Sequence, residues 1–178
     1  MALSKQQLSQ RIFLIGPMGV GKTTIGVQLA QNLKLPFYDS DKELEKHTGA
    51  SIPLIFELEG EDGFRKRETA ILLDLVKLDQ FVIATGGGII IRPENREILK
   101  NQGFNVFLTA DIEKLFERTS KDRNRPLLQT DDPHAKLKQI MSQRLAFYQE
   151  VADLCIDTGV LPIRRVVSKI KKALDALK

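Results

Sequence analysis

Short apolar runs rich in β-branched and aromatic residues alternate along this chain with longer stretches of helical periodicity. The short runs predict five strands, at residues 11–15, 36–39, 80–85, 105–109 and 153–157. The longer stretches predict helices over residues 22–33, 41–48, 51–58, 63–78, 93–101, 111–120, 133–152 and 163–177. Ser51 and Asp132 stand where N-caps are expected, each shortly before a proline. Strands that alternate with helices indicate an α/β fold with a parallel sheet covered on both faces.

The chain is expected to form one domain. Its 178 residues suffice for one well-packed core and are few for two. It contains no evident internal repeat, low-complexity tract or interdomain linker. The charged, turn-rich segment 120–132 joins two predicted helices, and long connections of this kind are usually functional or disordered. Its arginines and the apolar residues 126–128 favour a lid.

Composition limits the partners and the location. The formal net charge is +4, but basic residues are scattered among acidic ones and aromatics are few, so a nucleic-acid partner is not expected. The N-terminal residues lack the apolar core of a signal peptide, and no apolar run approaches the ~20 residues that a bilayer requires. The single cysteine, Cys155, lies in an apolar run and is expected to be a buried strand residue. A reducing cytoplasm fits these features.

A nucleotide-binding motif follows the first predicted strand. Residues 16–23 read GPMGVGKT and fill the P-loop pattern G-x-x-x-x-G-K-[ST] between a strand and an amphipathic helix. The alternative is a plain glycine turn, but the fixed positions recur by chance in only about 1% of chains of this length. Backbone N–H groups and the helix dipole favour phosphate at such a helix start. The residues expected to bind ATP here are Gly16, Gly19, Val20, Gly21, Lys22, Thr23 and Thr24.

Within this motif, Lys22 is expected to reach the β- and γ-phosphates, and the Thr23 hydroxyl is expected to bind Mg²⁺. Asp39 and Asp41 end the second predicted strand, at the sheet edge where α/β proteins bind ligands. One carboxylate can complete the Mg²⁺ shell and the other can accept a proton from a phosphoryl acceptor. The alternative is that Asp41 only caps the helix after it. Where many P-loop proteins carry a Walker-B aspartate, this chain has residues 84–85, Ala-Thr, so Thr23 and, through water, Asp39 are expected to hold the metal.

Residues 63–68, GFRKRE, place consecutive cations at the start of a predicted helix, which is an unusual choice at the positive end of its dipole. A nearby anion would explain them, and Arg65 can fork onto a carboxylate. Solvation is the default for Lys66, and an ion pair with Glu68 or another acid is as plausible for Arg67. These alternatives remain open at the level of the sequence.

Glycines Gly86, Gly87 and Gly88 follow another predicted strand at the same sheet edge. Three glycines expose backbone N–H groups and allow close approach, so a ligand-binding loop is favoured over a tight turn. Arg118, Arg123 and Arg125 flank the expected lid, and Arg144 lies on the next helix. An arginine that closes over phosphates can stabilise transition-state charge, although surface solvation is the alternative for each and is favoured for Arg123. His47 and His134 are not assigned to a metal, and five basic residues between 164 and 172 are expected on the solvated face of the last helix.

The ordered set GPMGVGKT, YDSD, GFRKRE, TGGG, RNRPLL and MSQRLAFY resembles the shikimate kinases of the nucleoside-monophosphate-kinase-like P-loop group, over nearly the whole chain. The resemblance implies a five-stranded parallel sheet of order 2-3-1-4-5, a substrate-binding helical region at about residues 41–70 and a mobile lid at about 120–132. It implies a single kinase domain over residues 1–178 that acts as a monomer in the cytoplasm. It further implies ATP-dependent phosphorylation of the shikimate 3-hydroxyl, with Mg²⁺, in aromatic amino acid biosynthesis.

The resemblance also implies residue roles. Asp41 contacts the substrate hydroxyls and serves as base, whereas Arg65, Arg144 and residues 86–88 hold shikimate. Arg125 reaches the ATP phosphates from the lid, beside Lys22 as a catalytic residue, and Arg118 flanks the adenine. Family members often place an arginine in the loop after the last strand, but residues 159–162 read GVLP here, which leaves the adenine contacts of that loop open.

Two other functions compete with this reading. A gluconate or nucleotide kinase of the same fold would also bind an anionic acceptor, so the residue chemistry separates it only weakly. A P-loop regulator that binds nucleotide and signals to a partner protein is the rival from another class. The arginine set and the paired aspartates argue against a regulator.

Overall fold

The computed structural model describes residues 4–120 and 126–177. Its strands are β1 (Arg11–Ile15), β2 (Phe37–Asp39), β3 (Phe81–Ala84), β4 (Phe104–Thr109) and β5 (Leu154–Asp157). Its helices are α1 (Lys5–Leu8), α2 (Lys22–Leu33), α3 (Ser40–Thr48), α4 (Ile52–Leu75), α5 (Pro93–Gln102), α6 (Ile112–Thr119), α7 (Pro133–Val151) and α8 (Ile163–Asp175), with a short 3₁₀ helix η1 (Pro126–Leu128). The predicted strands are all present, and their ends agree to within one residue.

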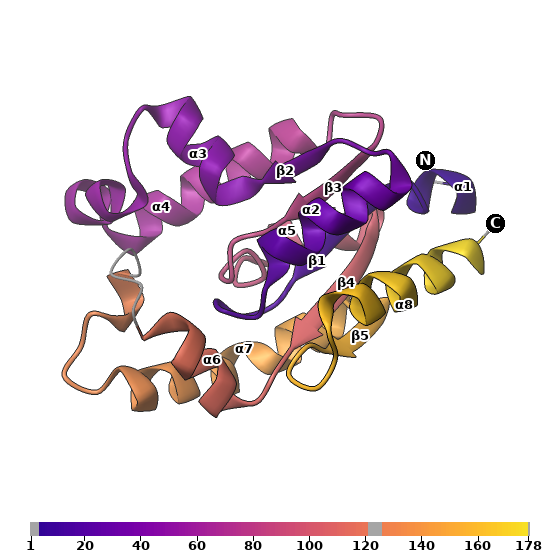
Figure 1. Cartoon of the computed structure of the whole chain (residues 1–178). Coiled ribbons are helices and arrows are strands. Elements are labelled where there is room, and N and C mark those ends of the chain that lie inside the picture. The colour runs from indigo at the N-terminus through magenta and orange to yellow at the C-terminus, as the bar shows by residue number, and fades with distance from the viewer. Residues whose placement is uncertain (1–3, 121–125, 178) are drawn as a thin grey trace.

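The strands form one parallel sheet in the order β2-β3-β1-β4-β5. This confirms the α/β class and the sheet order that the family resemblance implied. From β1 the chain passes over β3 to the edge strand β2, and from β3 it crosses back over β1 to β4 (Figure 1). The direction of the connections therefore changes beside β1, and crevices at such points are the usual ligand sites of open α/β sheets.

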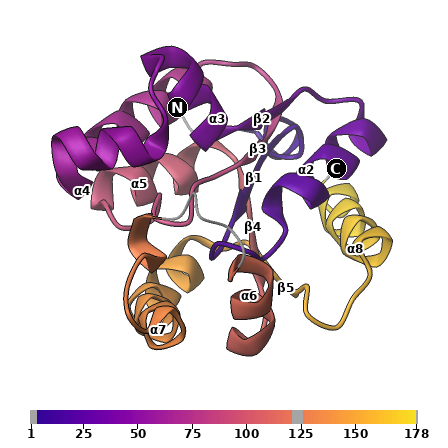
Figure 2. The same ribbon diagram turned by 60° about the vertical axis from the view of Figure 1, so that its left-hand side comes forward.

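Alternate residues of the central strands face opposite sides of the sheet. Ile12 and Leu14 pack against α2 and α8, whereas Phe13 and Ile15 pack against the core of α3, α4, α5 and α7. Figure 2 shows α2 and α8 on one side of the strands and α4, α5 and α7 on the other. Because both faces are covered, β1 is fully buried and reads as a continuous apolar run rather than an alternating one.

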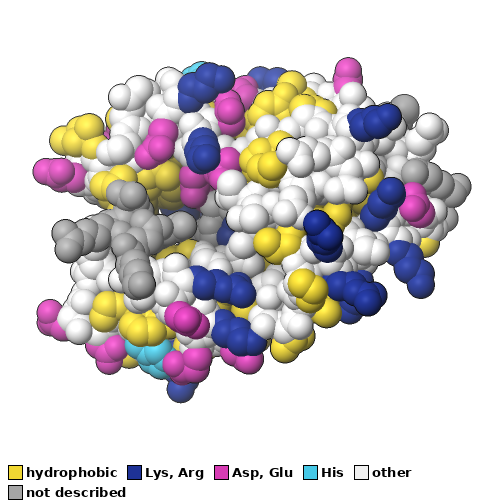
Figure 3. Space-filling model, viewed as in Figure 1, with side chains coloured by type: hydrophobic (Ala, Val, Ile, Leu, Met, Phe, Trp, Pro, Cys, Tyr) yellow, Lys and Arg dark blue, Asp and Glu magenta, His cyan; other side chains and the backbone are white. Residues whose placement is uncertain are grey.

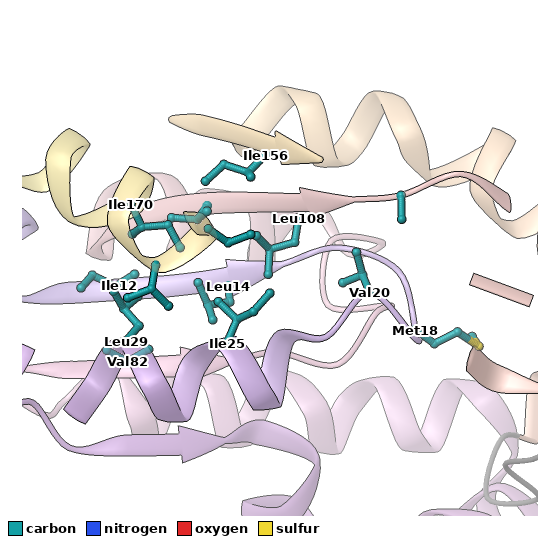
Figure 4. Packing of buried hydrophobic residues seen from close by; sticks show 14 of the residues in the cluster. Ile12, Leu14, Met18, Val20, Ile25, Leu29, Val82, Leu108, Ile156 and Ile170 are labelled. Atoms are coloured by element: carbon teal, nitrogen blue, oxygen red, sulfur yellow. The ribbon is translucent and has the colours of Figure 1, made fainter. Parts of the chain in front are cut away.

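The α2 side of the core continues into the nucleotide-binding loop. In Figure 4, Ile25 and Leu29 of α2 lie against the sheet near Leu14 and Val82. Val20, which belongs to the loop itself, is buried in the same cluster. The helix that carries the phosphate-binding N-terminus is thus anchored to the sheet by its apolar face.

Helix starts follow their local sequence. The Ser51 hydroxyl accepts from Leu54 N at 3.4 Å, and the Asp132 carboxylate accepts from Ala135 N at 2.9 Å, so both predicted caps are confirmed. At α3 the cap is Asp39, which accepts from Asp41 N at 3.1 Å. The suggestion that Asp41 might be only a helix cap is therefore wrong, because Asp41 lies inside the helix that Asp39 caps.

Three features differ from the sequence expectations. The helices predicted at 51–58 and 63–78 are both present within α4, but they meet directly at Gly60, whose non-helical φ of 68° only glycine adopts readily, with no longer connection between them. The short α1 had no prediction. Cys155 is exposed, because β5 is an edge strand whose outward residues face solvent, so the expectation of a buried thiol is wrong.

The surface adds two observations. Within the part of the chain that the structure covers, no helix has the length and apolar character needed to cross a membrane. Basic side chains gather over α8, at the right of Figure 3. The predicted residues of this group, Arg164, Arg165, Lys169, Lys171 and Lys172, are all exposed, which confirms that they form the solvated face of the last helix.

Candidate active site

The nucleotide-binding loop is shaped by glycines at positions that other residues resist. Gly16 (φ 140°), Gly19 (φ 78°) and Gly21 (φ 98°) all adopt positive φ. A Cβ on Gly16 would also overlap the carbonyl of Leu108 in β4, so the chain leaves the sheet in direct contact with the neighbouring strand. These constraints turn the chain sharply from β1 into α2, and the free N–H groups of α2 face the space above the sheet.

A cavity of about 880 Å³ opens beside this loop. Its lining runs from Val20–Ile25 across Asp39 and Asp41 to Arg118 and the segment 161–163. The Lys22 ammonium donates to the carbonyl oxygens of Gly16 at 2.7 Å and Pro17 at 2.8 Å, so its side chain arches over the loop. The predicted loop residues therefore surround one space large enough for a nucleotide.

The candidate metal residues lie side by side. The Thr23 hydroxyl donates to an Asp39 carboxylate oxygen at 2.7 Å. That bond leaves the hydroxyl lone pairs available, and Asp39 can bind a metal-bound water. Mg²⁺ keeps several waters and takes few protein oxygens beside those of phosphates, so this pair fits its preferences. The described residues contain no cluster of three or more His, Cys, Asp or Glu side chains that would suit a metal held by protein alone.

One end of the larger cavity is formed by Arg118, which was expected to flank the adenine, and by the segment after β5, whose contacts the sequence left open. Arg118 is exposed and its Nη1 lies 3.4 Å from the Gly19 carbonyl, which places it beside the loop. Leu161, Pro162 and Ile163 line the same cavity, so this segment presents an apolar wall rather than an arginine. The Thr158 hydroxyl donates to the Val20 carbonyl at 3.0 Å, a link to the loop that the sequence gave no signal for.

A second, smaller cavity of about 70 Å³ adjoins the first, and Met18, Asp41 and Gly87 line both. Its other lining comes mainly from α4, α7 and the residues after β3, and includes Arg65, Glu68, Gly86, Gly88 and Arg144. The predicted substrate residues, which are distant in sequence, thus meet at one place.

The close approach at the glycines is made by the protein's own side chains. A Cβ on Gly86 would lie 2.7 Å from an Asp41 oxygen and 2.7 Å from a Glu68 oxygen. A Cβ on Gly88 would overlap the Arg65 guanidinium. The absence of side chains here therefore makes room for Asp41, Glu68 and Arg65, a reason that the sequence alone did not reveal.

Two N–H groups of this loop remain for a ligand. Gly86 N donates to the Ser40 hydroxyl at 2.9 Å. Neither Gly87 N nor Gly88 N donates a hydrogen bond to any residue that the structure describes. Gly88 is buried and Gly87 is half-buried, and such N–H groups are rarely left without an acceptor, so both are available to donate to an anionic or hydroxyl ligand.

Arg65 is held by acids of its own helix. Its guanidinium is 6% exposed and donates to Glu68 at 2.8 Å and to Glu61 at 2.9 Å. Lys66 pairs with Asp62 at 2.9 Å, and Arg67 with Glu59 at 2.8 Å. These cations lie near the start of the second helical part of α4, which follows the non-helical Gly60, and acids on both sides of Gly60 supply their partners.

Arg144 differs from Arg65. Its side chain is buried, with 7% of the residue exposed, and no carboxylate of the described residues lies within ion-pair distance of it. Burial lowers the pKa of its guanidinium, yet arginine remains protonated at neutral pH. An unpaired buried cation is costly, so this position favours an anionic ligand.

Sequence analysis missed Glu68 as a member of this site. Its side chain is 2% exposed, and burial raises its pKa to about 7, although the positive charge of Arg65 acts in the opposite direction. The i, i+3 spacing of Arg65 and Glu68 on a helix was an available signal.

Arg125 and most of the arginine-bearing part of the expected lid lie outside the described residues.

Comparison with known proteins identifies the family. The family description "Shikimate kinase" matches residues 18–175. This chain belongs to the shikimate kinase family. The shikimate kinase of Thioalkalivibrio sulfidiphilus is 52% identical over 164 residues, which cover 92% of this chain and 86% of the relative. The shikimate kinase of Bordetella pertussis is 51% identical over 165 residues, which cover 93% of this chain and 78% of that relative.

Solved structures agree with this assignment. A shikimate kinase from Acinetobacter baumannii in complex with shikimate superposes with a TM-score of 0.92 at 46% identity, covering 95% of this chain and 94% of that one. A gluconokinase from Sinorhizobium meliloti superposes with a TM-score of 0.60 at 17% identity, and the match covers 96% of this chain and 94% of that one. The second likeness concerns the fold alone, so the gluconate kinase alternative receives no support beyond a shared architecture.

Proposed function

We propose that this protein transfers the γ-phosphoryl group of ATP to the 3-hydroxyl of shikimate, giving shikimate 3-phosphate and ADP. The chain is a kinase of the shikimate kinase family, so the acceptor class and the co-substrate follow from the family. The observation that carries the proposal is Arg144, a buried guanidinium without a carboxylate partner among the described residues, in a small cavity that adjoins the nucleotide cavity. It calls for an acceptor that bears a carboxylate.

The remaining contacts suit a ring with hydroxyl groups. Arg144 and Arg65 bind the carboxylate, and the Gly87 and Gly88 N–H groups donate to the same molecule. Asp41 lies at the boundary of both cavities, where an acceptor hydroxyl must meet the γ-phosphate. Asp41 therefore anchors that hydroxyl and accepts its proton as the phosphoryl group arrives.

Phosphoryl transfer depends mainly on position and charge. Lys22 leaves the loop carbonyls for the β- and γ-phosphates, and Arg118 flanks the adenine against the apolar wall of residues 161–163. Thr23 and, through a water molecule, Asp39 would hold Mg²⁺, whose charge would neutralise the phosphates there. Arg125, on a lid at about residues 120–132, adds positive charge beside the migrating phosphoryl group, and the lid also excludes water.

The wider setting is proposed on the same basis. The enzyme acts in the cytoplasm as a monomer, without a nucleic-acid partner, in the synthesis of aromatic amino acids. Residues 1–178 form one kinase domain, in which about residues 41–70 bind the acceptor.

Steady-state kinetics with ATP and a panel of acceptors tests the proposal. Shikimate is phosphorylated, whereas gluconate and nucleoside monophosphates are poor acceptors. Arg144→Ala raises the KM for shikimate by roughly 10- to 100-fold, because a charge-assisted bond to a desolvated carboxylate is lost, and it leaves the KM for ATP nearly unchanged. Arg67→Ala is the matched control, since it removes a surface guanidinium that pairs with Glu59. Efficient turnover of gluconate without activity on shikimate would overturn the proposal.

A further inference from the structure

Tyr148 is the largest of the fully buried side chains, and it reaches the glycine loop from α7. Its hydroxyl donates to the carbonyl oxygen of Gly87, 61 residues away in the sequence. The ring stacks on Phe107 of β4, with centroids 5.0 Å apart and planes 14° apart. The stack explains the ring, but it does not explain why a hydroxyl is buried at its end.

The carbonyl of Gly87 and the N–H of Gly88 belong to one peptide group. In a trans peptide these two groups point in opposite directions, and the described chain has no cis peptide. A donor that holds the Gly87 carbonyl therefore aims the Gly88 N–H away from Tyr148. That N–H has no acceptor among the described residues, and Gly88 lines the smaller cavity.

A peptide between two glycines needs such a restraint. Neither neighbour carries a Cβ, so the sterics that normally limit peptide rotation are weak on both sides. The hydrogen bond to the carbonyl also polarises the peptide and strengthens the N–H as a donor. Ser40 restrains the preceding N–H, at Gly86, in a similar way.

Tyr148 also stands beside Arg144. The two residues are one helical turn apart on α7, and the positive charge of Arg144 offsets part of the effect of burial on the tyrosine. Burial raises the pKa of Tyr148 to about 12, so the hydroxyl keeps its proton and donates it at every working pH. Its oxygen lone pairs remain for the guanidinium.

We propose that Tyr148 is a positioning residue of the acceptor site, whose hydroxyl orients the Gly87–Gly88 peptide and the Arg144 guanidinium toward the same bound molecule. The inference rests on the proposed function, because it concerns how the acceptor is held. Tyr148 itself does not reach the reacting atoms. Loss of the hydroxyl weakens acceptor binding and leaves the nucleotide site intact.

Tyr148→Phe tests this, because it keeps the ring and its stack on Phe107. The KM for shikimate rises about tenfold, the loss expected for a buried hydrogen bond that aligns two contacts, while the KM for ATP stays within about twofold. Calorimetric titration of shikimate into the protein without ATP shows the same loss in Kd. Tyr38→Phe is the matched control, since the chain has two tyrosines and Tyr38 lies outside both cavities.

Phe107→Leu separates positioning from packing. It removes the stacking ring but leaves the Tyr148 hydroxyl, so it lowers Tm more than Tyr148→Phe and changes the KM for shikimate less. An unchanged KM in Tyr148→Phe, or a rise matched by Phe107→Leu, overturns the positioning role. Equal increases in the KM for shikimate and for ATP also overturn it. Lack of shikimate turnover in the wild-type protein instead overturns the proposed function, and the inference with it.

Discussion

Replacement of Glu68 by glutamine should change how the stability of this protein depends on pH. The Glu68 carboxyl is 2% exposed, and one of its oxygens accepts from Arg65 at 2.8 Å. The other oxygen has no hydrogen-bond partner among the described residues. Burial outweighs the attraction of Arg65 and raises the pKa of Glu68 from 4.5 to about 7.

The sign of the effect follows from proton counting. Between about pH 4.5 and 7, folded Glu68 retains a proton that the unfolded chain has lost. The folded state binds more protons in this range, so the free energy of unfolding falls as pH rises. A shift of this size corresponds to about 3 kcal/mol across the whole range, since one pKa unit is about 1.4 kcal/mol.

Urea unfolding followed by circular dichroism measures this contribution. The unfolding free energy of the wild type, minus that of Glu68→Gln, should fall by about 3 kcal/mol between about pH 5 and pH 8. Glu59→Gln is the control, because Arg67 lowers the pKa of Glu59. The stabilising effect of the Glu59 carboxylate is lost only as pH falls through that lowered pKa. The difference in unfolding free energy between the wild type and Glu59→Gln therefore stays constant between about pH 5 and pH 8. A flat difference for Glu68→Gln as well would refute the reasoning.

Three further substitutions probe the two cavities. Lys22→Met abolishes turnover but keeps the fold, since Lys22 is half-buried and lines the larger cavity instead of packing in the core. Thermal melting beside an ADP-release assay checks both, and undiminished activity would contradict the P-loop assignment. Asp41→Asn lowers kcat by roughly 10²-fold with little change in the KM for ATP, as loss of a positioned base predicts, and a near-normal kcat would leave Asp41 without a catalytic role. Gly88→Ala displaces the Arg65 guanidinium and raises the KM for shikimate but not the KM for ATP. Kinetics equal to those of the wild type would show that shikimate binding does not depend on the position of the Arg65 guanidinium.

Much of the architecture was readable because its signals are local. A buried parallel strand such as β1 appears as an unbroken apolar run, and the residues expected to bind phosphate around Lys22 form one contiguous motif. The order of the strands could not be predicted from such local signals, since periodicity does not say which strands are neighbours, and it came from the family resemblance instead. The direct junction of two helices at Gly60 was also invisible, because the apolar pattern breaks there whether one residue or a longer loop separates the helices.

Errors arose where the environment of a residue depends on topology. Cys155 sits in an apolar run, but only the sheet order shows that its strand is an edge. An anion was expected near Arg65 and an ion pair was one alternative for Arg67, whereas Lys66 was expected to be solvated, and the sequence did not say whether the anions belong to a ligand or to the protein. The acids of α4 supply them, whereas Arg144, which lines the smaller cavity together with Arg65, has no carboxylate partner among the described residues.

The sequence by itself determined the strands, most helices and the P-loop motif, because each of these is written within a few consecutive positions. The tertiary structure decided how those residues share their hydrogen bonds. Tyr148 meets Gly87 across 61 residues, and Thr158 meets Val20 across 138. Such contacts exist only when the sheet brings its strand ends together, since no local pattern encodes the distance between segments that far apart.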